Sequence, residues 1–271
     1  MTPDVLLGLD VGSISVNLVA VTPEGEVLEE QYLRHHGQPM RVAAEALRAA
    51  LTTYGPERLA GLAATGSGGR AVAALLGGTY VNEVVAQAAA TQALHPQVNT
   101  IIEIGGEDSK LVLLRDPEGR RTEGVADFAM NAMCAAGTGC FLDQQATRLN
   151  LTIEEFGRAA LESQHPPRVA GRCSVFAKSD MIHLQQKATP EQDIIAGLCF
   201  ALVRNFKSTV GSGASLIPPV SFQGGVAANP GIIRALREVL ELPGEDLVVP
   251  EHFAAMGAIG AVLLNRGLLV A

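Results

Sequence analysis

The fold is decided by one short segment, Val5-Leu-Leu-Gly-Leu-Asp10-Val-Gly12-Ser-Ile-Ser15, in which an apolar run ends in an acidic residue and a glycine. The run from Val5 to Leu9 is typical of a buried strand, and strand-like patterns resume over residues 16–21 and 27–32. Three strands joined by tight turns are therefore predicted. Backbone N–H groups of the first turn could point at phosphate oxygens. An ordinary Asx-type turn is the alternative.

The same pattern returns 93 positions later, at Glu103-Ile-Gly-Gly-Glu-Asp-Ser-Lys110. A buried-strand pattern over residues 100–105 precedes it, and residues 110–114 suit the second strand of a hairpin. Three acids and one Lys within eight residues could hold Mg²⁺ through water and position a nucleophilic water, although a solvated polar turn has the same composition. Two such turns predict two similar halves that face a cleft.

Helices and strands alternate between these two turns, as in an α/β layer. Helices are predicted over residues 41–51, 69–76 and 83–94, and strands over 59–64 and 79–81. A first lobe of residues 1–97, completed by a C-terminal helix over 254–271, and a second lobe of residues 98–253 are therefore expected.

The second half is more helical. Thr152-Ile-Glu-Glu155 and Thr189-Pro-Glu-Gln192 both match the capping box that starts a helix. The second has Pro190 at the predicted first helical position, and its helix is expected to reach about Thr209. Strands are predicted over residues 220–223 and 247–249, with a helix opening at Asn229-Pro230.

Composition limits the possible functions. The 271 residues are 48% hydrophobic and 18% charged, with a net charge of -8 and no Trp. Without a Lys/Arg-rich run, nucleic acid is not an expected partner, and small polar ligands fit better. No apolar stretch approaches the length of a membrane span, and the first residues lack a basic signal-peptide start. We expect a cytoplasmic protein.

A third polar segment, Phe222-Gln-Gly-Gly-Val-Ala-Ala-Asn-Pro230, combines a strand, a double-glycine turn and a helix N-terminus. This order suits close approach by a nucleotide. The chain has no G-x-G-x-x-G after a strand and no G-x-x-x-x-G-K-[ST], so Rossmann and P-loop sites are excluded. It also lacks the G-x-S-x-G elbow of many hydrolases.

Two of the four cysteines precede expected helices. Cys134 stands before Ala-Ala-Gly-Thr-Gly139 and Cys173 follows Gly171-Arg, and a helix N-terminus favours a thiolate that can bind metal. Either residue could equally be a small core side chain, which is our interpretation of Cys140 and Cys199. Two cysteines cannot complete a four-thiolate cluster, but a symmetric dimer could supply the other two.

The six histidines show no zinc-site spacing. We expect them, including His35 and His36, to lie at the surface.

Together, the two hairpins and the Gly-Gly turn resemble the acetate and sugar kinase/Hsc70/actin ATPase superfamily, with its two-lobed, actin-like (ribonuclease H-like) fold of duplicated βββαβαβα units around a nucleotide cleft. The cysteine-containing segments narrow the resemblance. Residues 131–141, 171–180 and 104–110 are similar to the activator ATPases of 2-hydroxyacyl-CoA dehydratases and to the ATPase subunits of benzoyl-CoA reductase. Residues 224–231, 250–252 and 257–260 fit the closing pattern of that family, so the match spans nearly the whole chain.

The resemblance implies a homodimer that binds ATP/ADP and Mg²⁺ and holds one [4Fe-4S] cluster, with Cys134 and Cys173 of each chain as ligands. It also implies that ATP turnover changes the angle between the helices that begin at the cluster. One low-potential electron would then pass from ferredoxin or flavodoxin to a partner iron–sulfur dehydratase or reductase.

The resemblance implies three catalytic residues, Asp10, Glu103 and Glu107, of which Asp10 and Glu103 position Mg²⁺ and water. Cofactor contacts are implied for Gly12, Ser13, Ser15, Gly105, Gly106, Asp108, Lys110, Gly137, Thr138, Gly139, Gly224, Gly225, Val226 and Asn229.

The chain departs from the family pattern at three positions. Many members have Thr and Lys where this chain has Ile14 and Asn17, and Asp where it has Glu103. The Glu-Ile-Gly-Gly-Glu-Asp form is more similar to the ATPase module of large fused activator-like proteins, so both a free-standing protein and a module remain open.

Three other functions remain open on the same fold. They are a sugar or N-acetylhexosamine kinase, an ATP-dependent reductase of a double-cubane-cluster protein, and a non-redox nucleotide switch.

Overall fold

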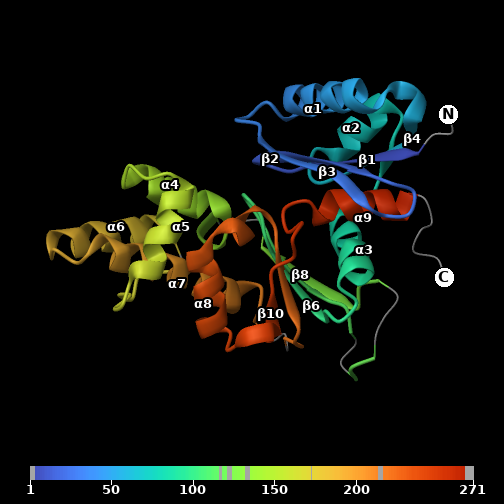
Figure 1. Ribbon diagram of the computed structural model, residues 1–271. Coiled ribbons are helices and arrows are strands. Elements are labelled where there is room, and N and C mark those ends of the chain that lie inside the picture. The colour runs from blue at the N-terminus through green and yellow to red at the C-terminus, as the bar shows by residue number, and fades with distance from the viewer. Residues whose placement is uncertain are drawn as a thin grey trace. The chain divides into compact units, whose positions relative to one another are not determined.

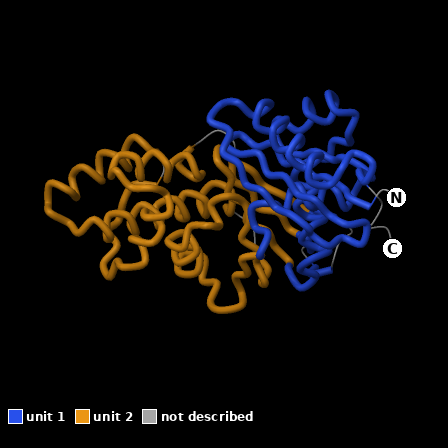
Figure 2. Tube along the Cα trace, turned by 45° about the horizontal axis from the view of Figure 1, so that its top comes forward, with its two compact units in different colours: residues 1–98, 114–126, 251–271 blue, residues 99–113, 127–250 orange. Residues whose placement is uncertain are grey.

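The computed structural model describes residues 4–115, 118–120, 124–131, 135–171, 173–212 and 216–265. The chain divides into two compact units, shown in different colours in Figure 2. Unit 1 comprises residues 1–98, 114–126 and 251–271, and unit 2 comprises residues 99–113 and 127–250.

The sheet of unit 1 begins with the three predicted strands. They are β1 (Val5–Val11), β2 (Ser15–Val21) and β3 (Val27–Arg34). The three pair in antiparallel fashion, while β4 (Leu59–Thr65) and β5 (Thr79–Tyr80) extend the sheet in parallel on the other side of β1. The order is β3-β2-β1-β4-β5, so β1 and its hairpin turn lie at the centre.

Helices cover both faces of this sheet (Figure 1). Leu7 and Leu9 pack with α1 (Pro39–Tyr54) and α2 (Gly69–Leu76), whereas Leu6 packs with α3 (Glu83–Leu94) and α9 (Met256–Asn265). Alternate residues of a strand point to opposite faces, so the even-numbered positions of β1, Asp10 included, face α9.

The sheet of unit 2 repeats this topology. It contains β6 (Thr100–Ile104), β7 (Ser109–Leu113), β8 (Asp127–Asn131), β9 (Val220–Gln223) and β10 (Leu247–Val248). The order is β10-β9-β6-β7-β8, with antiparallel pairs on one side of β6 and parallel pairs on the other. The prediction of two similar halves is confirmed, although β8 had not been predicted.

The helices of unit 2 are α4 (Gly139–Arg148), α5 (Ile153–Glu162), α6 (Ser174–Gln186), α7 (Glu191–Thr209) and α8 (Pro230–Val239). Short 3-10 helices occur at η1 (Pro56–Arg58) in unit 1, and at η2 (Ala135–Gly137), η3 (Gly225–Ala228) and η4 (Gly244–Asp246) in unit 2.

One predicted capping box is confirmed and the other is wrong. At α5, the Thr152 hydroxyl accepts the Glu155 N–H and the Glu155 carboxylate accepts the Thr152 N–H. At α7 the N-cap is Pro190, in an extended conformation and without a side-chain cap. Thr189 therefore stands one residue too early for its hydroxyl to cap the helix.

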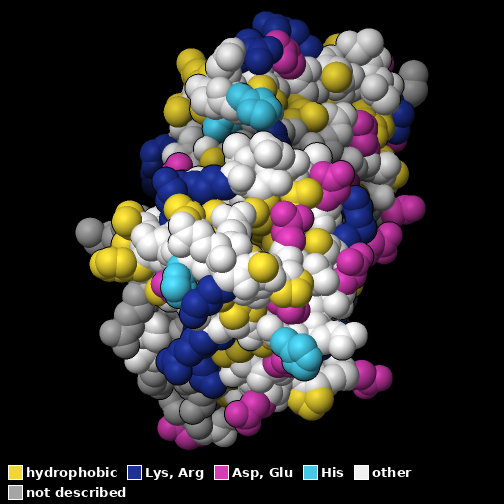
Figure 3. Space-filling view, turned by 90° about the vertical axis from the view of Figure 1, so that its left-hand side faces the viewer, with side chains coloured by type: hydrophobic (Ala, Val, Ile, Leu, Met, Phe, Trp, Pro, Cys, Tyr) yellow, Lys and Arg dark blue, Asp and Glu magenta, His cyan; other side chains and the backbone are white. Residues whose placement is uncertain are grey.

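The surface carries mixed charge. On the face in Figure 3, basic side chains gather chiefly towards the left and acidic ones chiefly towards the right, with apolar and polar side chains between them. Across the described residues, none of the helices combines the length and hydropathy needed to span a membrane.

Candidate functional site

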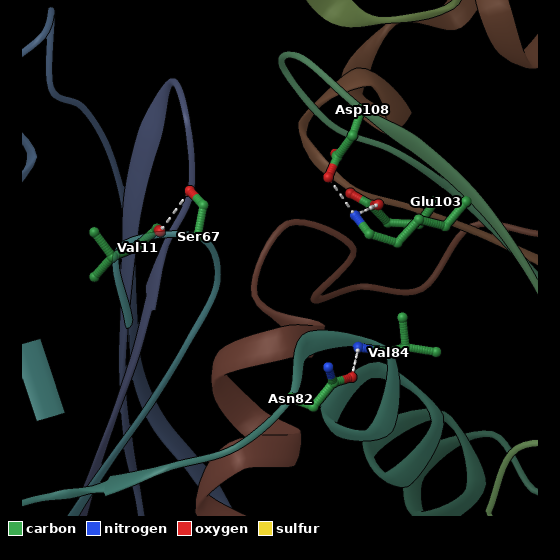
Figure 4. A network of polar contacts seen from close by, with 7 residues as sticks. Val11, Ser67, Asn82, Val84, Glu103 and Asp108 are labelled. Atoms are coloured by element: carbon green, nitrogen blue, oxygen red, sulfur yellow. Dashed lines mark hydrogen bonds and ion pairs between the residues drawn. The ribbon is translucent and has the colours of Figure 1, made fainter. Parts of the chain in front are cut away.

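Glu103 and Lys110 face each other across the β6–β7 hairpin of unit 2. The Gly105 N–H donates to the Asp108 carbonyl at 3.0 Å, which closes the turn. Lys110 Nζ donates to Glu103 Oε2 and to Asp108 Oδ2, both at 2.8 Å (Figure 4). The Lys110 side chain is 2% exposed, that of Glu103 8% and that of Asp108 31%. Two carboxylates therefore share one buried cation.

The first turn of α4 is bound to this hairpin turn. The Gly139 N–H donates to the Gly105 carbonyl and the Cys140 N–H donates to the Gly106 carbonyl, both at 2.8 Å. A Cβ at position 139 would lie 3.1 Å from the Gly105 oxygen and 3.1 Å from Val226 Cγ2. A side chain at position 139 would therefore be tightly packed, and the segment that follows Cys134 packs on both glycine turns of unit 2.

The double-glycine turn after β9 lies against Glu103. Gly224 has a φ of +88°, and a Cβ there would lie 2.5 Å from the Ile104 carbonyl and 2.7 Å from Glu103 Oε1. The absence of a side chain thus leaves room for the second carboxylate oxygen. The segments around Glu103, Gly139 and Gly224 were predicted separately, and the fold brings them together.

The other predicted cofactor residues of unit 2 have varied surroundings. Asn229 caps α8, because its Oδ1 accepts the N–H groups of Gly231 and Ile232. Thr138 is buried and its hydroxyl donates to the Ala135 carbonyl at 2.9 Å. Glu107 is exposed at the tip of the β6–β7 turn. Their contacts with a nucleotide stay predictions.

In unit 1, Asp10 lies beside a loop that the sequence patterns did not single out. A Cβ on Gly66 would overlap Asp10 Oδ1, and one on Gly257 would overlap Asp10 Oδ2. The loop is held to the β1 end by the Gly68 N–H, which donates to the Val11 carbonyl at 2.8 Å, and by the Ser67 hydroxyl at 3.4 Å (Figure 4). The signal for this loop, a T-G-S-G-G string directly after a strand, was present at residues 65–69.

Two buried oxygens lie in the strands on either side of Asp10. Asn17 and Thr65 are its register partners in β2 and β4. Because directly opposite residues share one face of a sheet, the three side chains lie on the face that α9 covers. Asn17 Oδ1 and Thr65 Oγ1 are buried, and neither has a hydrogen-bond partner within the described part of the chain. The Asp10 carboxylate therefore lies beside the side-chain oxygens of Asn17 and Thr65 at this end of the sheet.

His35 is buried next to the turn between β1 and β2, so the expectation that it lies at the surface is wrong. It is 5% exposed, its Nδ1 accepts the Gly37 N–H at 3.1 Å and its Nε2 lies 3.2 Å from the Gly12 carbonyl. Since Nδ1 accepts, the proton of the neutral ring is on Nε2 and donates to Gly12. His36 is exposed, as expected.

Within the same turn, the Gly12 N–H donates to the Ser15 carbonyl at 2.9 Å. Ser13 and Ser15 are partly exposed.

The cysteines have three kinds of surroundings. Cys173 is the N-cap of α6 and is a partly exposed free thiol, and Cys140 is also partly exposed. Cys199 is buried in α7, and burial raises the pKa of its thiol to about 12. Cys134 lies outside the described residues, as does Arg172. Over the residues that are described, no three His, Cys, Asp or Glu side chains group as metal ligands, so the ligand pair stays a prediction.

Asn205 of α7 contacts both segments that carry the predicted ligands. Its Nδ2 donates to the Gly171 carbonyl at 2.7 Å. A Cβ on Gly137 would lie 2.7 Å from its Oδ1. Asn205 was not singled out from the sequence, because an isolated Asn in an apolar helix carries no local signal.

Comparison with known proteins relates this arrangement to one family. The sequence profile described as the BadF/BadG/BcrA/BcrD ATPase family matches residues 7–265. An activator of lactoyl-CoA dehydratase from Anaerotignum propionicum is 30% identical over 270 residues, which cover 95% of both chains.

A 2-hydroxyisocaproyl-CoA dehydratase activator from Clostridioides difficile is 36% identical over 185 residues, or 68% of this chain and 65% of the relative. In three dimensions, the solved structure of the activator of the 2-hydroxyisocaproyl-CoA dehydratase from Clostridium difficile with bound ADPNP superimposes with a TM-score of 0.83 at 27% identity. That match covers 97% of this chain and 95% of the other.

Proposed function

Because the chain belongs to the BadF/BadG/BcrA/BcrD ATPase family, we propose that it hydrolyses ATP to drive electron transfer to a partner enzyme. Single electrons leave a [4Fe-4S] cluster in this proposal. The acceptor is a 2-hydroxyacyl-CoA dehydratase or a benzoyl-CoA reductase-type enzyme. Relatives named as activators of lactoyl-CoA and 2-hydroxyisocaproyl-CoA dehydratases support this acceptor class.

The observation that carries the proposal is the direct bond between the Gly105-Gly106 turn and the first turn of α4. Cys134 precedes Gly139 by five residues. A displacement of the β6–β7 turn by nucleotide phosphates would therefore act on the first turn of α4, only a few positions after Cys134 in the sequence. A nucleotide enzyme without redox chemistry has no need of such a route.

The carboxylates suit a nucleotide-bound cation. We assign Asp10 and Glu103 to Mg²⁺ and the attacking water, since carboxylate oxygens are preferred ligands of this ion. Asp10 is flanked by glycines and by the buried oxygens of Asn17 and Thr65. Mg²⁺, when bound, neutralises charge that develops on the phosphates.

We assign the residues of the glycine turns to the nucleotide itself. The turns at Gly12, Ser13 and Ser15 and at Gly105 and Gly106 contact phosphates, with Glu107 near the water. The turn at Gly224, Gly225 and Val226 lies on the adenosine side with Asn229.

The cluster would be held by thiolates of Cys134 and Cys173 from two copies of the chain. Cys173 suits this role because it is a free thiol at the N-terminus of a helix of 13 residues, which favours the thiolate. Val175 and Phe176 follow it at 65% and 64% exposure, and apolar side chains of this kind are covered in a dimer. When bound, the cluster supplies the low-potential electron, and ferredoxin or flavodoxin is the proposed donor.

The proposal is tested by measuring iron and acid-labile sulfide, and EPR after reduction, on anaerobically purified protein. The parent is compared with Cys134→Ser and Cys173→Ser, and Cys199→Ala is the matched control because that thiol is buried in α7. We expect about four irons per dimer in the parent and the control and none in the two Ser variants. Mg²⁺-dependent ATP hydrolysis is measured on the same samples.

Protein that stays free of iron after cluster reconstitution would overturn the redox proposal. If it then phosphorylated a sugar or an N-acetylhexosamine, the kinase alternative would replace it. Protein with no iron, no kinase activity and negligible ATP hydrolysis would favour the nucleotide switch.

A further inference from the structure

Lys110 is among the largest side chains that are fully buried in the described residues. Lysine is seldom buried unless it is paired, and here two carboxylates flank it at 2.8 Å each. One positive charge against two negative ones leaves an excess negative charge at the β6–β7 turn. The Lys110 ammonium therefore occupies a position between carboxylates in which a metal cation could otherwise bind.

The resemblance implies a cofactor contact for Lys110, but the surroundings of its amine do not suit a phosphate ligand. The residue lies inside β7, between Glu103 of β6 and Met130 of β8 in the ladder. To reach a phosphate, the amine would leave two carboxylates that accept its hydrogen bonds, and the buried Glu103 carboxylate would lose this ion pair.

The amine also determines which way Glu103 is turned. Glu103 Oε2 is bound to Lys110. Its other oxygen, Oε1, lies over positions that only glycine leaves open, 3.2 Å from a Cβ at Gly105 and 2.7 Å from one at Gly224. The carboxylate is therefore held with one oxygen on the lysine and the other on the glycine turns.

We propose that Lys110 is a positioning residue for ATP hydrolysis that acts through Glu103 and Asp108. Its ammonium replaces a divalent cation between the two carboxylates, keeps Glu103 Oε1 directed at the glycine turns, and lowers the affinity of the nucleotide-free turn for Mg²⁺. The ion then enters with the nucleotide. This inference rests on the ATP hydrolysis of the proposed function and not on the cluster.

Lys110→Met tests the assignment, with Lys110→Arg as the charge-retaining variant and Lys187→Met as the matched control at an exposed lysine. Three quantities are measured: Mn²⁺ affinity without nucleotide by EPR, ADPNP affinity, and kcat and KM for ATP. In Lys110→Met we expect Mn²⁺ binding at least ~10-fold tighter and kcat at least ~10-fold lower, because two carboxylates lose their cation. ADPNP affinity should change less than ~3-fold, since no phosphate contact is lost.

Lys110→Arg should bind Mn²⁺ like the parent and recover part of kcat, and it serves also if Lys110→Met does not fold. If Lys110 were a phosphate ligand, Lys110→Met would reduce ADPNP affinity at least ~10-fold and leave Mn²⁺ affinity unchanged. That result would overturn the proposal. Unchanged kcat in Lys110→Met would do the same. If the parent hydrolyses no ATP, the proposed function fails, while the Mn²⁺ titration still reports on the lysine.

Discussion

At the scale of single residues, several glycines lie next to the acidic groups of the site and leave space for their carboxylates. Gly66 and Gly257 lie against the two oxygens of Asp10, and Gly224 lies against Glu103. Gly66 and Gly224 also have φ angles of +83° and +88°, where other residues are strained. Gly66 and Gly224 are therefore required both by the backbone and by a carboxylate, whereas Gly257 is required by a carboxylate.

Gly66→Ala tests the contact with Asp10, and Gly77→Ala is its control. Gly77 has a φ of +67° and nothing within 4 Å of a Cβ, whereas a Cβ at Gly66 meets Asp10 and the Val11 carbonyl. Both variants should lose about 1 kcal/mol of unfolding free energy through backbone strain. Only Gly66→Ala should also lower kcat/KM for ATP, by at least ~10-fold, because displaced catalytic groups lose their alignment. Equal kcat/KM values in the two variants would contradict the placement of Asp10 in the site.

At the scale of elements, α7 is the support on which the cysteine-bearing segments of unit 2 pack. Cβ atoms at Gly171 and Gly197 would overlap the Ala201 and Pro167 carbonyls respectively, so the segment before α6 runs close along α7. Asn205 adds a hydrogen bond to the same segment and contacts η2 from the other side. One buried helix thus determines where both segments lie.

The start of α7 is attached to the end of α5 through Asp193. Its Oδ1 accepts the Ser163 hydroxyl at 2.6 Å and the His165 N–H at 3.2 Å. The Ser163 hydrogen bond is the main reason that the pKa of Asp193 is lowered. A lowered pKa in the folded state stabilises the fold above the unfolded pKa, and the contribution is lost as the pH falls through the folded value.

Asp193→Asn should therefore lower the unfolding free energy by about 1 kcal/mol at pH 7. Urea unfolding measured from pH 7 down to pH 3 should show the difference from the parent shrinking below about pH 4. Glu191→Gln, one residue after the N-cap and exposed, is the control. A difference that stays constant down to pH 3 would mean that the ionised carboxylate is not the stabilising form.

At the scale of the whole molecule, the two units share one topology and differ in an insertion. Between β3 and β4, unit 1 has α1 and a short 3-10 helix, whereas between β8 and β9 unit 2 has α4, α5, α6 and α7. Cys134 and Cys173 both lie in that longer stretch. The repeated part carries most of the residues proposed to contact the nucleotide, and the insertion carries the cysteines proposed to hold the cluster.

Removal of iron should dissociate the dimer if the cluster joins two chains. Each chain supplies two proposed thiolates and a [4Fe-4S] cluster takes four, so the cluster contributes to association by mass action. Sedimentation of reduced protein before and after treatment with an iron chelator should shift from dimer towards monomer. Cys199→Ala should behave like the parent. A dimer that survives complete loss of iron would show that the protein surface alone holds the two copies together.

Much of the fold followed from local patterns. Both hairpins and helices such as α2 and α3 depend on apolar periodicity and on turn residues within about ten positions, all of which can be found in the sequence. Strand β8 was missed because its exposed Phe128 and Met130 contradict the usual alternation of a half-buried strand. His35 was misplaced because a buried histidine differs from a surface one only in its partners.

The residue types of the candidate site were visible in the sequence, since carboxylates, paired glycines and cysteines are rare enough in these combinations to be found without a structure. Their grouping was not. Asp10, Gly66 and Gly257 belong to segments separated by more than 50 and nearly 200 positions, and Lys110 was predicted only as a cofactor contact. Tertiary packing decided the grouping, because residues far apart in the sequence meet only in the folded chain, where burial ties the Lys110 ammonium to the two carboxylates that flank it.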